Sequence, residues 1–152
     1  MTGKQALVLA TLGSATLMAG ALAFQYLGGL PPCKMCYWQR YPHVAAVAIG
    51  ALALATSQRF LCLIGAVAAL TTSAIGLFHA GVEQGFWEGP TSCTSSPIDG
   101  LSADELFDQI MAAPIVRCDE IPWELLGLSM AGWNGVVSLG LGLLWILAWR
   151  RA

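Results

Sequence analysis

Long runs of apolar residues alternate with short polar segments along this chain. The runs long enough for membrane-crossing helices cover residues 6–27, 37–56, 60–80 and 125–149. A helix needs about 20 mostly apolar residues to cross a bilayer. The second run reaches that length only if its helix begins directly after Cys36. The pattern predicts an all-α membrane protein, with a four-transmembrane-helix bundle that forms a single membrane domain over residues 1–152.

Two polar loops lie on the same side of the predicted bundle, a short one at 28–36 and a long one at 81–124. The long loop contains "LSADELFDQIM", in which Ser102 and Glu105 fit a capping box at a helix start. Its apolar residues share one helical face: Leu106, Phe107, Ile110 and Met111. This segment predicts a short amphipathic helix, which lies on the membrane surface or packs on a core of the loop itself.

Composition supports the membrane class. Of the 152 residues, 57% are hydrophobic and 11% are charged, whereas a soluble domain carries about 25% charged residues. Glycine and alanine recur inside the runs, and small residues let helices approach closely in lipid. We therefore expect the chain to contact a lipid bilayer, and we expect no nucleic acid partner.

Charge gives the expected orientation. One side carries Lys4, Arg59, Arg150 and Arg151, and the other carries Lys34, Arg40 and Arg117. All nine acidic residues fall between Glu83 and Glu124, so the long loop is aqueous. We place both termini in the cytoplasm, which makes Trp145 and Trp149 an inner aromatic belt. In an alternative reading, the first run is a cleavable signal peptide ending at "ALA", residues 21–23.

Four of the five cysteines lie in the two outer loops, and Cys62 alone lies in the third run. Three interpretations of these four cysteines remain open: two structural disulfides, a metal site of four thiolates, or two cysteine pairs that exchange electrons. Zinc sites usually combine two closely spaced C-x2-C pairs. Cys93 and Cys118 are far apart in sequence, so we expect no metal.

The neighbourhood of Cys33 and Cys36 favours the redox reading. Their spacing puts both thiols on one helical turn, and the two prolines before Cys33 are typical of a helix start. The positive end of a helix and nearby cations lower the pKa of a thiol and make it more reactive. Lys34 and Arg40 supply such cations. A structural disulfide needs none of these features.

Three further residues near this pair are candidates for a site. Arg40 lies on the same helical face as Cys36, and either reaches the membrane interface or holds a polar head group such as a quinone carbonyl. His79 closes the third run on the outer side, where it is a neutral interface residue or faces the same pocket and handles protons. We expect a structural role for His43.

At this point the cysteine order resembles a known family. The chain has a C-x-x-C loop after the first span and a two-cysteine loop after the third. This order resembles that of the disulfide bond formation protein B family, whose members are bacterial inner-membrane thiol:quinone oxidoreductases. The matching passages are "PPCKMCYWQRYPH", "GPTSC" and "RCDEIPWELLGLSMAGWN". With the helix layout, the resemblance covers nearly the whole chain.

The resemblance implies roles for these residues. Cys33 and Cys36 match the quinone-facing pair, with Cys36 next to the quinone, and Arg40 matches the quinone-site arginine. His79 corresponds approximately in spacing to a quinone-site histidine. The family uses membrane ubiquinone or menaquinone as its cofactor, and its loops face the periplasm.

The long loop has its own implied roles. Cys93 matches the cysteine that forms a mixed disulfide with a periplasmic thioredoxin-like oxidase of the DsbA type, and Cys118 matches the partner of Cys93. "PTSCTSSP" around Cys93 indicates an extended peptide for a groove of that partner. Cys62 has no counterpart and is expected to be a small buried hydrophobe.

Two alternatives remain at this stage. The vitamin K epoxide reductase-like fold also combines four helices, thiols and quinone, but its C-x-x-C comes late in the bundle and its loop cysteines early, which is the reverse of this chain. The other alternative is a membrane scaffold with two structural disulfides.

Overall fold

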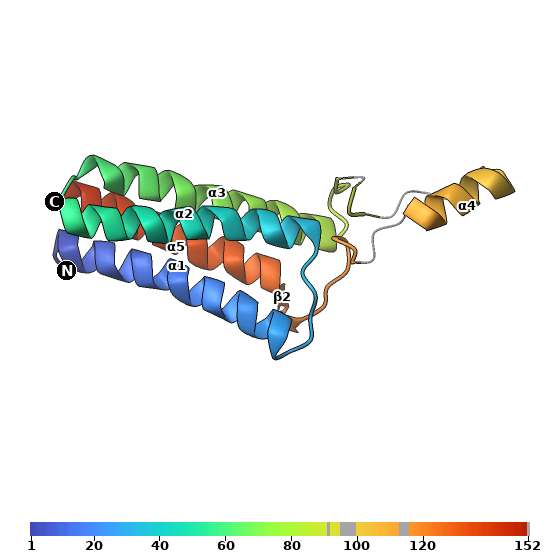
Figure 1. Cartoon of the computed structure of the whole chain (residues 1–152), viewed down its shortest axis with the longest axis horizontal. Coiled ribbons are helices and arrows are strands. Elements are labelled where there is room, and N and C mark those ends of the chain that lie inside the picture. The colour runs from blue at the N-terminus through green and yellow to red at the C-terminus, as the bar shows by residue number, and fades with distance from the viewer. Residues whose placement is uncertain (91, 95–99, 113–115, 152) are drawn as a thin grey trace.

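The computed structural model describes residues 1–90, 92–94, 100–112 and 116–151. Its body is a bundle of α1 (Gly3–Tyr26), α2 (Lys34–Thr56), α3 (Phe60–Glu83) and α5 (Met130–Arg150). The helices lie side by side, and the N and C termini lie at the same end (Figure 1). In the described part of the chain, α1, α3 and α5 are long and apolar enough to cross a membrane. This architecture is that of a helical membrane protein.

Helix α2 is as long as its neighbours but less apolar. Its first half contains Gln39, Arg40 and His43, which are costly in lipid unless they face the interior of a bundle. Gln39 and His43 are buried, so the polar residues of α2 point inward. The inward polar face explains why α2 carries a weaker apolar signal than the other long helices.

Helix α2 begins at Lys34, earlier than the predicted start after Cys36. Cys33 occupies the N-cap with an extended backbone (φ −74°, ψ 174°), and its Sγ accepts a hydrogen bond from the Cys36 N–H. A side chain that accepts from the first turn stabilises a helix start. The cap places both cysteines at the end of the bundle opposite the termini.

The last helix begins later than the predicted residue 125. Residues 124–129 form a hairpin, in which β1 (Glu124–Leu125) pairs antiparallel with β2 (Leu128–Ser129). The two loop residues both have positive φ, 54° at Leu126 and 78° at Gly127, as a type I′ turn requires. The prediction of helix through this apolar segment was wrong, because the leucines continue the hydrophobic pattern while the Leu-Gly turn reverses the chain.

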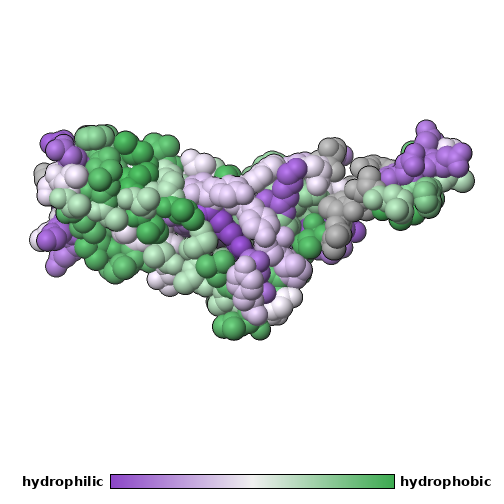
Figure 2. Space-filling view, viewed as in Figure 1, coloured by the Kyte–Doolittle hydropathy of each residue, from purple (hydrophilic) through white to green (hydrophobic). Residues whose placement is uncertain are grey.

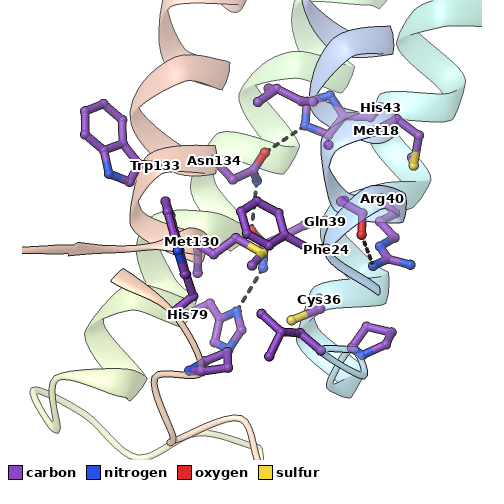
Figure 3. Close-up of a pocket in the computed structure, with 18 of the residues that line it drawn as sticks. Met18, Phe24, Cys36, Gln39, Arg40, His43, His79, Met130, Trp133 and Asn134 are labelled. Atoms are coloured by element: carbon purple, nitrogen blue, oxygen red, sulfur yellow. Dashed lines mark hydrogen bonds between the residues drawn. The ribbon is translucent and has the colours of Figure 1, made fainter. Parts of the chain in front are cut away.

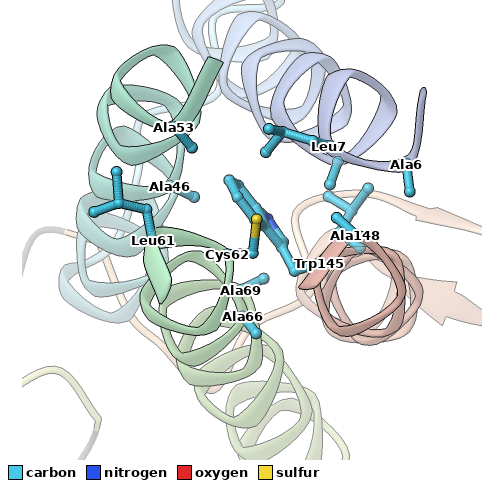
Figure 4. Close-up of a cluster of buried hydrophobic side chains, with 12 residues drawn as sticks. Ala6, Leu7, Ala46, Ala53, Leu61, Cys62, Ala66, Ala69, Trp145 and Ala148 are labelled. Carbon is cyan, nitrogen blue, oxygen red and sulfur yellow. The ribbon is translucent and has the colours of Figure 1, made fainter. Parts of the chain in front are cut away.

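The core at the terminal end of the bundle packs around Trp145, whose side chain is fully buried (Figure 4). The predicted place of Trp145 in an inner aromatic belt is therefore wrong. Cys62 lies in the same cluster and is buried, as expected of a small hydrophobe.

Helices α3 and α5 pack closely near the middle of the bundle. A Cβ added at Gly76 would lie 2.8 Å from the backbone nitrogen of Gly135 and 2.9 Å from the carbonyl oxygen of Ala131. Only glycine permits this backbone approach, which is the usual role of small residues between membrane helices. The contact fixes the positions of His79 and Asn134, which lie on these two helices.

The predicted amphipathic helix is confirmed as α4 (Ala103–Ala112). Ser102 and Glu105 form the expected capping box, since the Ser102 N–H donates to the Glu105 carboxylate and the Glu105 N–H donates to the Ser102 hydroxyl. Phe107, Ile110 and Met111 are largely exposed, so α4 does not pack on a core of the loop. It extends beyond the cysteine end of the bundle with one apolar side (Figures 1 and 2).

Candidate functional site

The first cysteine pair lies in the opening turn of α2. The Sγ atoms of Cys33 and Cys36 are 2.9 Å apart, and the Cys33 thiol donates toward the Cys36 sulfur. Both are free cysteines in this structure. Cys33 is buried, whereas Cys36 is partly exposed and lines a cavity. The pair therefore has one inner and one outer member.

The two thiols differ in acidity. The hydrogen bond to Cys36, reinforced by burial, raises the pKa of Cys33. The Cys36 sulfur accepts this bond, and the Arg40 guanidinium lies one helical turn away; both stabilise negative charge on Cys36. The hydrogen bond therefore favours negative charge on Cys36 over Cys33 when the pair is reduced.

The second pair is joined as a disulfide between Cys93 and Cys118. The backbone N–H of Cys118 also donates to the Cys93 carbonyl, at 2.6 Å. The Sγ of Cys118, the Sγ of Cys33 and a ring nitrogen of His79 all lie within 4.8 Å of one another. An S–S bond is about 2.05 Å long, so Cys33 and Cys118 need to approach by less than about 3 Å to exchange.

Cys93, the residue expected to bond with a partner, is buried in this structure. Its side chain is 1% exposed and packs with Met35 and Val82. The N–H groups of Cys93 and Thr94 both donate to the Pro90 carbonyl. This turn contradicts the predicted extended peptide as far as "PTSCTSSP" is described, and residues 91 and 95–97 lie outside the described part. In this structure the Cys93 sulfur is therefore not accessible from the surface.

A cavity of about 280 Å³ opens beside Cys36, between α1, α2, α3 and α5 (Figure 3). Most of its wall is apolar, from Leu17, Met18, Phe24, Leu30, Met130 and Trp133. Its polar groups come from Cys36, Gln39, Arg40, His43, His79, Glu83 and Asn134. A largely apolar pocket with a few converging polar groups is typical of a small-molecule site.

Arg40 contributes the permanent positive charge of this cavity. Its guanidinium donates to the Gln25 side chain at 2.6 Å and to the Ala21 carbonyl at 3.3 Å, both on α1. The same group lies 5.2 Å from the centre of the Tyr37 ring. These contacts hold Arg40 between α1 and α2 at the cavity wall, one helical turn from Cys36.

His79 is fully buried at the junction of the two cysteine pairs. Its Nε2 lies 3.1 Å from the Cys118 carbonyl oxygen and 3.6 Å from the Cys33 Sγ, and its Nδ1 lies 2.9 Å from the Gln39 amide nitrogen. His79 also lines the cavity. The structure thus brings together Cys33, Cys36, Cys118 and His79, with Arg40 at the cavity wall and Cys93 behind Cys118.

Sequence reasoning missed three polar residues of this site: Gln39, Glu83 and Asn134. Gln39 lies three residues after Cys36 and Glu83 four residues after His79, so helical spacing places each on the face of a candidate residue. Asn134 is a polar residue in an apolar span, which by itself indicates function. His43, expected to be structural, also lines the cavity and donates to the Asn134 side chain.

Cys33, His79 and Cys118 offer atoms of the kinds that bind metals. Zinc takes cysteine as a thiolate, and the Cys118 sulfur is bonded to Cys93. In this oxidation state the three residues therefore do not make a three-ligand metal site.

Comparison with known proteins identifies the family of this chain. The family model described as "Disulfide bond formation protein DsbB" matches residues 3–148. A relative from Albidiferax ferrireducens named "Disulfide bond formation protein B" is 34% identical, over 93% of this chain and 84% of its own. A relative of the same name from Methylococcus capsulatus is 32% identical, over 99% and 96% of the two chains. No solved structure matches the chain.

The family model covers nearly all of the four long helices and includes both cysteine pairs. Such coverage accounts for the helical membrane architecture and for disulfide oxidoreductase activity together. This chain belongs to the disulfide bond formation protein DsbB family.

Proposed function

We propose that this chain is a thiol:quinone oxidoreductase that reoxidises a periplasmic thioredoxin-like oxidase of the DsbA type and passes the electrons to membrane quinone. The observation that carries the proposal is the meeting of a dithiol and a disulfide, with the Cys33 and Cys118 sulfurs within 4.8 Å. A scaffold with structural disulfides needs no free pair at a cavity.

The membrane placement belongs to the same proposal. All four long helices cross the bacterial inner membrane, with α2 as the fourth span and both termini in the cytoplasm. Cys33 and Cys36 lie at the start of α2, which is at the opposite end of the bundle from the termini (Figure 1), and the Cys93–Cys118 disulfide lies beside them. This orientation puts both pairs in the periplasm, where disulfides persist. The cavity wall then lies at the membrane edge, where a lipid-soluble molecule can enter.

Electrons enter through Cys93. The reduced partner's thiolate attacks the Cys93 Sγ, the Cys93–Cys118 bond breaks, and the electron pair leaves on Cys118. The partner's second thiol then displaces Cys93 and closes the partner's own disulfide. Each step is attack of a thiolate on a disulfide through a mixed disulfide.

The second exchange connects the pairs. The Cys118 thiolate attacks Cys33 of the oxidised Cys33–Cys36 pair, which releases Cys36 as a thiolate. Cys93 then attacks Cys118, restores its own disulfide and leaves Cys33 and Cys36 reduced. This end state has the oxidation states of the structure, a Cys93–Cys118 disulfide beside two free thiols.

The residues around the cavity fit a quinone, and the family is generally quinone-linked. The apolar wall suits a ring and an isoprenoid tail, and Arg40 and His79 suit carbonyl oxygens. A bound ubiquinone or menaquinone supplies a sink for two electrons and two protons. Cys36 presents its thiolate to the cavity, Cys33 holds the proton behind it, and Arg40 places a positive charge near developing negative charge.

A coupled assay tests the proposal. The purified chain is mixed anaerobically with a reduced thioredoxin-like oxidase and a short-chain ubiquinone or menaquinone analogue. We expect quinol to form in amounts equal to the oxidase disulfide, with one analogue preferred. Oxidase that stays reduced with both analogues would support the scaffold alternative instead.

A further inference from the structure

A buried chain of side-chain hydrogen bonds links the two histidines of this protein across three helices. It runs from His79 on α3 through Gln39 on α2 and Asn134 on α5 to His43 on α2 (Figure 3). Buried polar groups are costly unless each finds a partner. The proposed function uses His79 only at the cavity, as a partner for a quinone carbonyl oxygen, and it leaves Gln39 and Asn134 without a role.

The direction of these hydrogen bonds is fixed by the Met35 carbonyl, which can accept a hydrogen bond but cannot donate one. The Gln39 amide nitrogen donates to the Met35 carbonyl at 3.2 Å, and it also lies 2.9 Å from the His79 Nδ1. The Gln39 Oε1 accepts from the Asn134 side chain at 2.8 Å. Because the Gln39 nitrogen is the donor, the Nδ1 of His79 must accept, and it carries no proton in the neutral ring.

The other nitrogen of His79 therefore carries the proton, and its surroundings agree. Nε2 lies 3.1 Å from the carbonyl oxygen of Cys118 and 3.8 Å from the Glu83 carboxylate, both of which accept. The remaining neighbour is the Cys33 Sγ at 3.6 Å. The Nε2–H group thus faces the place where Cys33 and Cys118 exchange.

Asn134 locks the orientation of Gln39. The Thr72 hydroxyl donates to the Gln39 backbone carbonyl at 2.9 Å and accepts from the Asn134 amide at 3.1 Å. His43 Nε2 lies 2.8 Å from the Asn134 Oδ1, so it donates to that oxygen. The Asn134 amide nitrogen is then left to point at Gln39, which requires the Gln39 oxygen to accept.

We propose that Gln39 and Asn134 are positioning residues that hold the proton of His79 on Nε2, so that this N–H stabilises negative charge on sulfur while the two cysteine pairs exchange. In that step the Cys118–Cys33 bond forms, the Cys33–Cys36 bond breaks, and the electron pair leaves on Cys36. One negative charge is spread over three sulfurs and no proton moves. The inference rests on the proposed function. It gives His79 a second role, at the sulfurs, besides its place in the cavity wall.

This role has a physical need behind it. Cys33 and Cys118 are both nearly inaccessible to solvent, so water does not stabilise a thiolate there. A hydrogen bond to a charged acceptor is about twice as strong as a neutral one. With the proton on Nδ1 instead, the Nε2 lone pair would face the sulfurs and repel the same charge.

The first test reads the position of the proton directly. The chain has only two histidines, so nitrogen-15 NMR of histidine-labelled protein gives two ring signals, which His43→Gln assigns. We expect His79 to be protonated on Nε2 in the wild type and to become a mixture of tautomers in Gln39→Met. Asn134→Ala, one step further along the chain of bonds, provides a second variant with the same expected change.

The second test reads the sulfur without quinone or partner. In a reduced Cys36→Ser/Cys93→Ser background, mass spectrometry of peptides follows alkylation of Cys33 separately from that of Cys118 and Cys62, and its pH dependence gives the pKa of Cys33. Adding Gln39→Met should raise that pKa by about one unit, a tenfold loss of thiolate. The matched control is Ser73→Ala, which removes a buried α3–α5 hydrogen bond to the Gly135 carbonyl and should leave the pKa unchanged.

The outcomes separate this inference from the proposed function. An unchanged His79 tautomer in both variants, or a changed tautomer with an unchanged Cys33 pKa, would overturn the positioning role even if quinone reduction proceeds. Conversely, a chain that fails to reduce quinone while both shifts appear would refute the proposed function and leave the positioning role standing.

Discussion

Replacing Cys36 by serine reduces quinone reduction to background, whether electrons come from a reduced thioredoxin-like oxidase or from dithiothreitol. Serine cannot form a disulfide with Cys33, so the pair cannot store and release two electrons. It also removes the sulfur that accepts the Cys33 hydrogen bond and faces the cavity. Loss of a covalent nucleophile removes most of the acceleration of an enzyme, and we expect a loss on the order of 10³-fold or more.

The control for this change is Cys62→Ala. Cys62 lies in the apolar core at the opposite end of the bundle, and its replacement should leave the initial rate of quinol formation within about twofold of the wild type. The rate is followed by quinone absorbance under anaerobic conditions. Substantial quinol formation by Cys36→Ser would remove Cys36 from its place beside the acceptor.

The second large effect belongs to Cys93. In Cys93→Ser the reduced oxidase finds no disulfide to attack, so we expect its oxidation to stop. Dithiothreitol is small enough to reduce the Cys33–Cys36 pair directly, and with it the same variant should still form quinol at a rate close to that of the wild type. This contrast between the two reductants distinguishes entry of electrons from their exit.

The entry step has a further structural requirement. Cys93 is 1% exposed, and the Lys34 ammonium donates to the Ser92 hydroxyl at 3.0 Å beside it. Under the proposed function, attack on this sulfur therefore requires that Cys93 first become exposed. Equal oxidation of the reduced oxidase by wild type and Cys93→Ser would show that another cysteine receives the partner.

The sequence predicted the parts of the fold that depend on local pattern. Four long helices were predicted from the apolar runs, the start of α4 from its capping box, and the burial of Cys62 from its place in an apolar run. The start of α5 was not predicted correctly, because Leu125, Leu126 and Leu128 continue the apolar pattern through a hairpin. Trp145 was misplaced for a similar reason, since hydrophobicity does not distinguish a core position from a lipid-facing one.

The site was predictable only where one helix carries the signal. Cys33, Cys36 and Arg40 share the first turns of α2, so their spacing was enough to group them. The approach of Cys118 to Cys33 and the bonds of Gln39 with His79 and Asn134 depend on how α2, α3 and α5 pack. Nothing in the sequence of one helix specifies that register, and the close contact at Gly76 that fixes it is visible only in the structure.

The adjacency of the two cysteine pairs is tested most directly by trapping the bond between them. A Cys36→Ser/Cys93→Ser variant keeps Cys33 and Cys118 and also retains Cys62 as an internal control. After mild oxidation, mass spectrometry of unreduced peptides should find Cys33 linked to Cys118 within one chain, with Cys62 still free. If Cys33 and Cys118 remain separate thiols, or link only between chains, electrons do not pass between the two pairs as described.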